Sequence, residues 1–190
     1  GVIDYDAQSK AKDKHLWTEE SFGDFELHVD WRIKELHGIY DMPILLSDGT
    51  ELKDENGKRI TVSKPNADSG ILLRGQLKSQ CNIWNWPVGS GEVYGYRRDM
   101  KQSPETRARV TPSRRADNPI GEWNKYIITM KGDLLTVNLN GETVIEDAQL
   151  AGIPAEGPIG FQHHGGKNKD GTFNNASSLV QFRNVFIKEL

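Results

Sequence analysis

The most constraining feature of the sequence is a strict alternation of apolar and polar side chains over residues 25–34. The apolar residues take every second position of the run FELHVDWRIK, and polar residues fill the positions between them. Successive side chains of a strand point to opposite faces of a sheet, so this period of two predicts a strand. One face of that strand is expected in the core, and the other face is polar.

Shorter apolar runs follow within residues 123–146 and are separated by turn signals. These runs are 127–131, 134–139 and 143–145. The turn signal Asn140-Gly141 separates the last two runs, and Asn-Gly is typical of a type I′ turn because both central residues need positive φ. The pattern predicts a three-strand antiparallel meander.

The remaining segments complete the predicted architecture. Residues 179–188 indicate a last strand, with a change of phase near Asn184, that ends the sheet. Residues 37–66 have a looser pattern around two turn signals and predict a hairpin excursion, because about 30 residues cannot enclose a core. Residues 97–121 are irregular and rich in Arg and Pro, which indicates a loop. No window keeps helical spacing, so the sequence predicts an all-β, antiparallel two-sheet sandwich of the jelly-roll type with little helix.

Length and composition exclude several classes of protein. A chain of 190 residues is expected to form one β-sandwich domain over residues 1–190. No apolar run approaches the roughly 20 residues that a membrane-spanning helix needs. The single cysteine, Cys81, permits no intrachain disulfide and no cysteine-based zinc site. The 24 basic and 27 acidic residues are nearly balanced, which gives no electrostatic reason to expect a nucleic-acid partner.

Motifs for the common catalytic chemistries are absent from the sequence. There is no serine nucleophile elbow, phosphate-binding glycine loop, zinc-binding His-Glu helix or calcium loop. A sandwich glycosidase needs two carboxyl groups close together, most simply on one strand face. The nearest run carries Glu26, His28 and Asp30, so local spacing does not support hydrolysis by two carboxylates.

The densest group of ligand-like residues lies at 80–86, with the sequence QCNIWNW. Strand alternation places Gln80, Asn82, Trp84 and Trp86 on one side. Amide groups beside an aromatic face are typical of sugar recognition, because hydroxyl groups need donors and acceptors while the apolar sugar face packs on a ring. An equally weighted interpretation is that the two indoles belong to the core.

Two other segments carry candidate residues. The sequence GFQHHGG at 160–166 places Gln162 and His164 in one strand phase and His163 in the other, so the adjacent histidines are not expected to clamp a metal. A lone histidine is more often structural than catalytic. Arg74 lies in an apolar run before a glycine, which predicts a buried anionic or carbonyl partner; the alternative is a structural ion pair, with Asp68 or Glu92 as partner.

The ordered segments of the chain resemble the 3-keto-disaccharide hydrolase family. The matching pieces are 16–18, 23–27 with 31–32, 67–75, 91–95, 121–124, 139–141, 159–165 and 182–185. The resemblance implies a concanavalin A-like lectin/glucanase sandwich and a secreted or periplasmic bacterial protein that processes glycans. It also suggests two departures. The chain is expected to lack a leading segment of the family domain, and Gln80 replaces an acidic residue that many members carry.

The family chemistry implies a site without a carboxylate pair. A ketone at C3 acidifies the C2 proton of a glucoside, so the glycosidic bond can break by elimination followed by hydration. Such a route needs a base and a group that stabilises the enolate oxygen, and the resemblance assigns these roles to His164 and Arg74.

The same resemblance extends to substrate-binding and metal-binding residues. The expected carbohydrate ligands are Gln80, Asn82, Trp84, Glu92, Tyr94, Gln162 and His163. The sequence requires no cofactor, although a divalent metal is conceivable with Asp68, Glu92 and His164 as ligands. The competing functions are a non-catalytic carbohydrate-binding module, for which the same face suffices, and a structural domain of a larger secreted enzyme.

Overall fold

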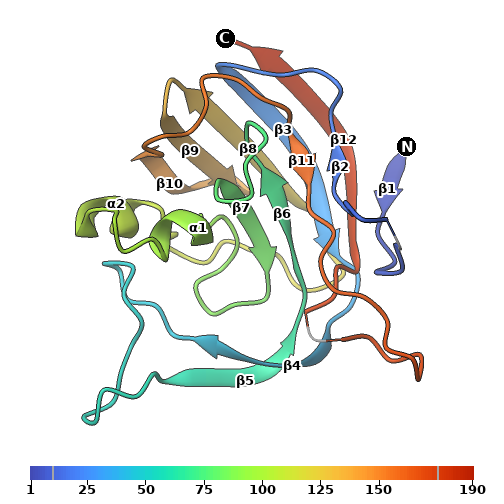
Figure 1. Ribbon diagram of the computed structural model, residues 1–190, viewed down its shortest axis with the longest axis vertical. Coiled ribbons are helices and arrows are strands. Elements are labelled where there is room, and N and C mark those ends of the chain that lie inside the picture. The colour runs from blue at the N-terminus through green and yellow to red at the C-terminus, as the bar shows by residue number, and fades with distance from the viewer. Residues whose placement is uncertain (10, 175) are drawn as a thin grey trace.

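The larger sheet of the protein has six strands. The computed structural model describes residues 1–9, 11–174 and 176–190. The strand order of this sheet is β1-β12-β3-β8-β9-β10, and every pair is antiparallel (Figure 1). The bounds are β1 Val2–Asp4, β3 Phe25–Ile33, β8 Asn124–Lys131, β9 Leu134–Leu139, β10 Glu142–Gln149 and β12 Val180–Glu189. The predicted strand at 25–34 and the predicted meander are therefore confirmed.

The last strand confirms one prediction and corrects another. Asn184 has φ 49°, and the register of β12 against β3 shifts between Arg183 and Phe186, so the phase changes where the sequence predicted. The strand does not end the sheet, however. Residues of β1 pair with the outer edge of β12, at Val2 with Arg183 for example.

The smaller sheet has four antiparallel strands and faces the larger one. Its order is β2-β11-β6-β7, with β2 Leu16–Trp17, β6 Asp68–Leu72, β7 Gln80–Trp84 and β11 Gly160–Phe161. The apolar side chains of β3 lie between the two sheets, together with Ile71, Cys81 and Ile83 of the smaller sheet, and all are at most 3% exposed. Burial of each large aliphatic side chain contributes about 1.5–3 kcal/mol. The fold is thus the predicted two-sheet antiparallel sandwich.

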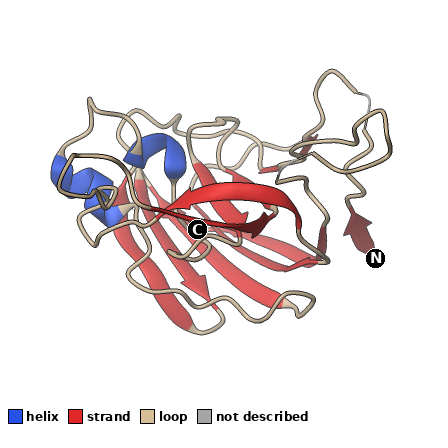
Figure 2. Cartoon of the chain, turned by 90° about the horizontal axis from the view of Figure 1, so that it is seen from below, coloured by secondary structure: helices blue, strands red, loops and turns tan. Residues whose placement is uncertain are grey.

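The segment 37–66 forms a long hairpin outside the smaller sheet. Strands β4 His37–Pro43 and β5 Thr61–Asn66 pair with each other as a separate two-stranded sheet. The hairpin runs across one end of the sandwich, which is seen most clearly in Figure 2. Met42 of β4 packs against Trp84 and Trp86, so the hairpin covers part of the outer face of the smaller sheet.

Two short helices occupy part of the region predicted as a loop. They are α1 Tyr94–Arg97 and α2 Pro104–Arg109, and both lie on the side of the molecule away from the amino terminus (Figure 2). The side chain of Ser103 caps α2 by accepting a hydrogen bond from the Thr106 amide at 3.0 Å. Helices of one or two turns are too short for periodicity to reveal. Neither has the length or apolar character of a membrane span, and this holds for all helices of the described residues.

Candidate functional site

The pairing of β6 with β7 decides which side chains face outward from the smaller sheet. Gly70 lies opposite Asn82, and Asp68 lies opposite Trp84. Residues directly opposite in a pair share one face, so these positions face away from the core while Cys81 faces into it. The predicted alternation along residues 80–84 is confirmed.

A pocket of about 270 Å³ lies on this outer face, between the sheet, the hairpin and α1. Its walls are Tyr40, Asp68, Leu77, Gln80, Asn82, Trp84, Trp86, Tyr94, Gly95, Gln162 and His164. Six of the nine residues predicted for the site therefore meet here. No sequence pattern indicated Tyr40 or Leu77 as pocket residues, and Asp68 was expected only as a conceivable metal ligand or as an ion-pair partner of Arg74.

Two amide side chains form the floor of the pocket. The Nε2 atom of Gln80 donates to the Ser69 carbonyl at 3.0 Å and to Oε1 of Gln162 at 2.6 Å. Both partners are acceptors, which fixes the orientation of both amides and leaves the Gln80 oxygen and the Gln162 NH₂ group for other partners. The Gln80 side chain crosses over Gly70, where a Cβ atom would lie 2.5 Å from Nε2. Only glycine at that position allows this crossing.

His164 is held by hydrogen bonds on three of its atoms. Its backbone amide donates to Oγ of Ser178 at 2.7 Å, and its carbonyl accepts from the Ser178 amide. The Nδ1 atom lies 2.9 Å from the Ala176 carbonyl. A carbonyl only accepts, so in the neutral form of the ring Nδ1 carries the hydrogen and Nε2 has the lone pair.

Asp68 shares the pocket with His164. Burial raises the pKa of the Asp68 carboxyl to about 6, and the nearby charge of His164 opposes that shift. The Oδ1 atom of Asp68 and the Nδ2 atom of Asn82 are buried and have no hydrogen-bond partner among the residues that the structure describes. Buried polar atoms are nearly always paired, so these two atoms mark a place where a ligand or water completes the structure.

The aromatic wall of the pocket contains Trp84 and Trp86, for which the sequence left open a sugar-binding role and a place in the core. Trp84 and Trp86 are stacked with their ring centres 3.9 Å apart, and only 3% and 5% of each residue is exposed. They form a small apolar cluster with Met42. The rings of Tyr40 and Tyr94 lie against this stack and are more than a third exposed. The tyrosines, not the indoles, thus offer an accessible ring to a sugar.

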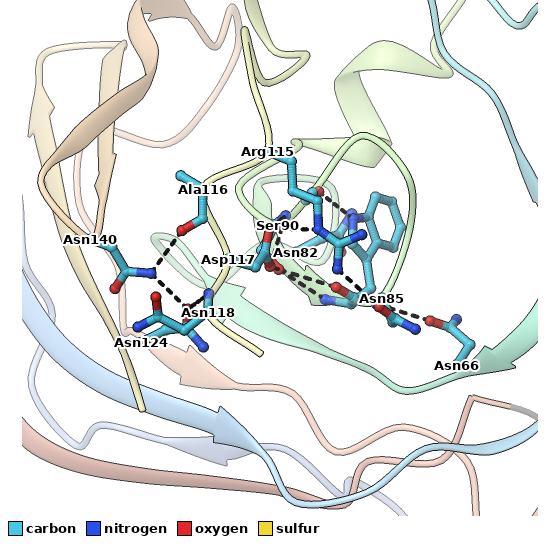
Figure 3. A network of polar contacts seen from close by, with 12 residues as sticks. Asn66, Asn82, Asn85, Ser90, Arg115, Ala116, Asp117, Asn118, Asn124 and Asn140 are labelled. Carbon is cyan, nitrogen blue, oxygen red and sulfur yellow. Dashed lines mark hydrogen bonds and ion pairs between the residues drawn. The ribbon is translucent and has the colours of Figure 1, made fainter. Parts of the chain in front are cut away.

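A network of polar contacts joins Ser90 to Asp117 (Figure 3), and hydrogen bonds from Trp84 to Ser90 and Gly89 connect the indole wall to it. Asp117 accepts hydrogen bonds from the amide and the hydroxyl of Ser90. The Ser90 hydroxyl in turn accepts from the Trp84 amide at 3.2 Å. The indole nitrogen of Trp84 donates to the Gly89 carbonyl at 2.7 Å. The loop after β7 is therefore locked against residue 117, which no sequence pattern indicated.

Arg74 lies outside the pocket, which corrects its predicted place beside His164. Its side chain is buried and donates to the carbonyls of Gly23, Gly132 and Pro154 at 2.6–3.0 Å. Nη2 also contacts Asp24 at 3.2 Å, so the ion-pair partner is neither Asp68 nor Glu92. None of these acceptors lines the candidate pocket, and Arg74 has a structural role.

Glu92 and His163 also lie away from the pocket. Glu92 is fully buried and forms an ion pair with Arg97; burial raises its pKa to about 7, against the lowering effect of Arg97. His163 faces the opposite side of the sheet and lines a separate cavity of about 520 Å³. Its ring packs edge-to-face against the ring of Tyr5, with the two ring centres 5.1 Å apart.

The conceivable metal ligands are consequently not assembled. Glu92 does not line the pocket that contains Asp68 and His164. Within residues 1–9, 11–174 and 176–190, no three histidine, cysteine or acidic side chains are placed to hold a metal ion.

Comparisons with known proteins agree with this architecture. The family model of the 3-keto-alpha-glucoside-1,2-lyase-like domain matches residues 1–188. The chain belongs to this family. No curated protein matches the chain.

Several solved structures are similar to this chain. Two are proteins of Parabacteroides distasonis ATCC 8503 assigned as glycosyl hydrolases. The first is 19% identical to this chain and superposes with a TM-score of 0.52; the match covers 94% of this chain and 77% of the Parabacteroides chain. The second is 18% identical with a TM-score of 0.50, covering 96% and 89%. The carbohydrate-binding module CBM66 of Bacillus subtilis is 14% identical with a TM-score of 0.49, covering 100% and 96%. At 18–19% identity, the similarity to the two Parabacteroides distasonis proteins shows a shared fold and nothing more.

Proposed function

We propose that the pocket binds a 3-keto-glucoside or a related glycan and that His164 is the base for cleavage of its glycosidic bond. The observation that carries this proposal is the arrangement of His164, which lines the pocket and whose Nδ1 is held by the Ala176 carbonyl, while Nε2 has no hydrogen bond to any other described residue. Membership of the lyase-like family supports the choice of substrate class.

The proposed reaction begins with loss of the C2 proton to Nε2 of His164. The electron pair of the C2–H bond forms a C1–C2 double bond through an enolate, and the C1–O bond to the leaving group breaks. Water then adds: its oxygen bonds to C1, and a proton returns to C2 from the imidazolium. The net change is hydrolysis, and no oxocarbenium ion needs a nearby carboxylate.

Neutral amides replace Arg74 as the groups that stabilise the enolate oxygen. The free NH₂ of Gln162 and the unpartnered Nδ2 of Asn82 both belong to the pocket wall. Preorganised donors in a largely buried site stabilise developing negative charge without having to reorient during the reaction.

Asp68 is the proposed acid for the leaving group. Because its pKa is raised to about 6, a substantial fraction of Asp68 is protonated near that pH. The protonated carboxyl gives its proton to the departing oxygen, and the resulting carboxylate takes a proton from the water that attacks C1. His164 and Asp68 then return to their starting states together.

A non-catalytic carbohydrate-binding domain is the second candidate function. It is favoured by Gln80, whose side-chain amide is held by hydrogen bonds to the Ser69 carbonyl and to Gln162 and, unlike a carboxyl group, cannot act as a general acid. The two exposed tyrosine rings at the pocket suffice for sugar stacking.

Turnover separates the two functions. The protein is incubated with a 3-keto-disaccharide and with the same disaccharide unoxidised, and the products are identified by mass spectrometry. The proposal predicts cleavage of the keto form alone. Saturable binding of the sugars without any product would contradict it and would favour the binding domain.

A further inference from the structure

A second pocket, of about 310 Å³, lies on the other side of Tyr94 from the saccharide pocket. Its walls are Gly49, Thr50, Glu51, Lys53, Arg97, Arg98, Met100 and Arg107. Four of these side chains are cationic and only one is acidic, in a chain whose net charge is −3. Positive charge is therefore concentrated in this pocket against the trend of the whole protein.

The pocket is assembled from distant parts of the chain by a close backbone contact. Gly49, at the hairpin tip, has φ 76°, and a Cβ atom there would lie 2.7 Å from the carbonyl oxygen of Arg107. Only glycine allows the tip to approach α2 this closely. The contact places Lys53 of the hairpin and Arg107 of α2 in one pocket.

The positive charges of this pocket are only partly neutralised. Arg97 is paired with the buried Glu92, and Glu51 lies 3.3 Å from Arg98, 3.8 Å from Arg97 and 3.6 Å from Arg59, so two carboxylates face three guanidinium groups. Lys53 and Arg107 form no ion pair within the described part of the chain.

Buried donors in the wall also lack partners. Arg97 is 3% exposed and its Nη2 atom has no hydrogen-bond partner, and the same is true of the buried Nε atom of Arg107. Buried N–H groups without acceptors are rare, so they point to an anion that completes the pocket.

Tyr94 connects this pocket with the saccharide pocket. Its ring forms part of the saccharide pocket, while the guanidinium carbons of Arg97 and Arg98 lie 5.4 and 5.6 Å from the ring centre. A single aromatic ring thus separates the sugar site from the cationic site.

We infer that the cationic pocket binds the anionic group of an acidic saccharide whose reacting unit occupies the saccharide pocket. Carboxylate and sulfate match the planar fork of arginine, so the substrate class is a glycoside that carries a uronate or a sulfate ester. This inference rests on the proposed saccharide function and narrows it to acidic substrates.

The test compares three unoxidised disaccharides that differ in one substituent of the leaving unit: neutral, uronic acid and sulfated. Their dissociation constants are measured by calorimetry at 20 mM and 500 mM NaCl. At low salt the acidic forms are expected to bind about tenfold more tightly than the neutral form, and high salt should reduce the preference. The acidic disaccharide with the lower dissociation constant shows whether the pocket prefers a carboxylate or a sulfate group.

Variants assign the preference to the pocket. Arg107→Gln and Lys53→Gln should each lower the ratio of acidic to neutral affinity by about threefold or more. Arg109→Gln is the matched control, because Arg109 lies on the same helix but outside this pocket and is more than half exposed. The ratio should stay unchanged in that variant.

Equal affinity for neutral and acidic disaccharides would overturn the inference, as would a preference that neither pocket variant reduces. The saccharide function is judged separately, by turnover of the neutral 3-keto-disaccharide. Cleavage of that substrate without an acidic preference would leave the proposed function intact and remove only the acidic substrate class.

Discussion

Two buried polar clusters of this protein differ in one respect, the completeness of their hydrogen bonding. Around Arg74, every nitrogen of the guanidinium group has an acceptor within the protein. In the saccharide pocket, Asp68 and Asn82 each keep a buried atom without a partner, and Nε2 of His164 is free. A complete cluster stabilises the fold, whereas an incomplete one costs stability until a ligand completes it. Substitutions in the two clusters should therefore have opposite effects.

The largest expected effect is on the complete cluster. Arg74→Met removes the five hydrogen bonds that the buried guanidinium group donates to three backbone carbonyls and to Asp24, and the free energy of unfolding should fall by about 3–5 kcal/mol. Urea denaturation measures the loss. Arg74→Lys keeps the charge but not the fork and should be intermediate. The saccharide affinity of the folded fraction should be unchanged. A loss of affinity would contradict the structural role and indicate that Arg74 contributes to the saccharide site.

In the incomplete cluster, the substitution Asp68→Asn should raise the free energy of unfolding instead of lowering it. The pKa of Asp68 in the folded protein, about 6, lies above the ordinary aspartate pKa of 3.8, so this group's contribution to stability is fully present below about pH 4 and is lost as the pH rises through about 6. The amide cannot ionise. At pH 8 the variant should therefore be about 1–3 kcal/mol more stable than the parent, while cleavage activity falls.

Denaturation at pH 4 and pH 8 checks this prediction. The difference between parent and variant should be large at pH 8 and nearly absent at pH 4. Asp170→Asn is the control, because hydrogen bonds from Thr172 lower the pKa of that exposed carboxyl and its loss should not stabilise the protein. Equal stability of Asp68→Asn and the parent at both pH values would contradict the account of the pocket.

The smallest expected effect belongs to Asp117, which positions the aromatic wall. Asp117→Asn weakens the hydrogen bonds from Ser90 and should cost about 1 kcal/mol of stability. Near-ultraviolet circular dichroism reports the stacked Trp84 and Trp86 rings, and their signal should decrease with a severalfold loss of saccharide affinity. Lost stability with an unchanged indole signal would limit Asp117 to a structural role.

Much of the fold and part of the pocket could be predicted because both depend on local alternation. The period of two in β3 and in residues 80–84 assigned each side chain to a face, and the same rule separated His164 from His163. Such assignments need no knowledge of the neighbouring strands.

The rest depends on contacts between distant segments, which local pattern does not carry. Tyr40 reaches the pocket because the hairpin folds over the smaller sheet, and Asp68 reaches it because β6 pairs with β7. Arg74 has φ 47°, a left-handed conformation that is rare for arginine. Strand β6 ends at Leu72, so the alternation of faces does not extend to Arg74. Its side chain therefore lies off the expected face and donates to the carbonyls of Gly23, Gly132 and Pro154.

The most direct test of the account is proton exchange at C2 of a 3-keto sugar without a leaving group, such as the 3-keto derivative of 1,5-anhydroglucitol. The ketone acidifies the protons at both C2 and C4, so exchange at the two positions must be followed separately. In D₂O, nuclear magnetic resonance resolves the two signals. The parent protein is predicted to exchange the C2 proton selectively, and His164→Asn should slow that exchange by about 10²–10⁴-fold. Equal exchange rates in the parent and in His164→Asn would contradict the claim that His164 is the base.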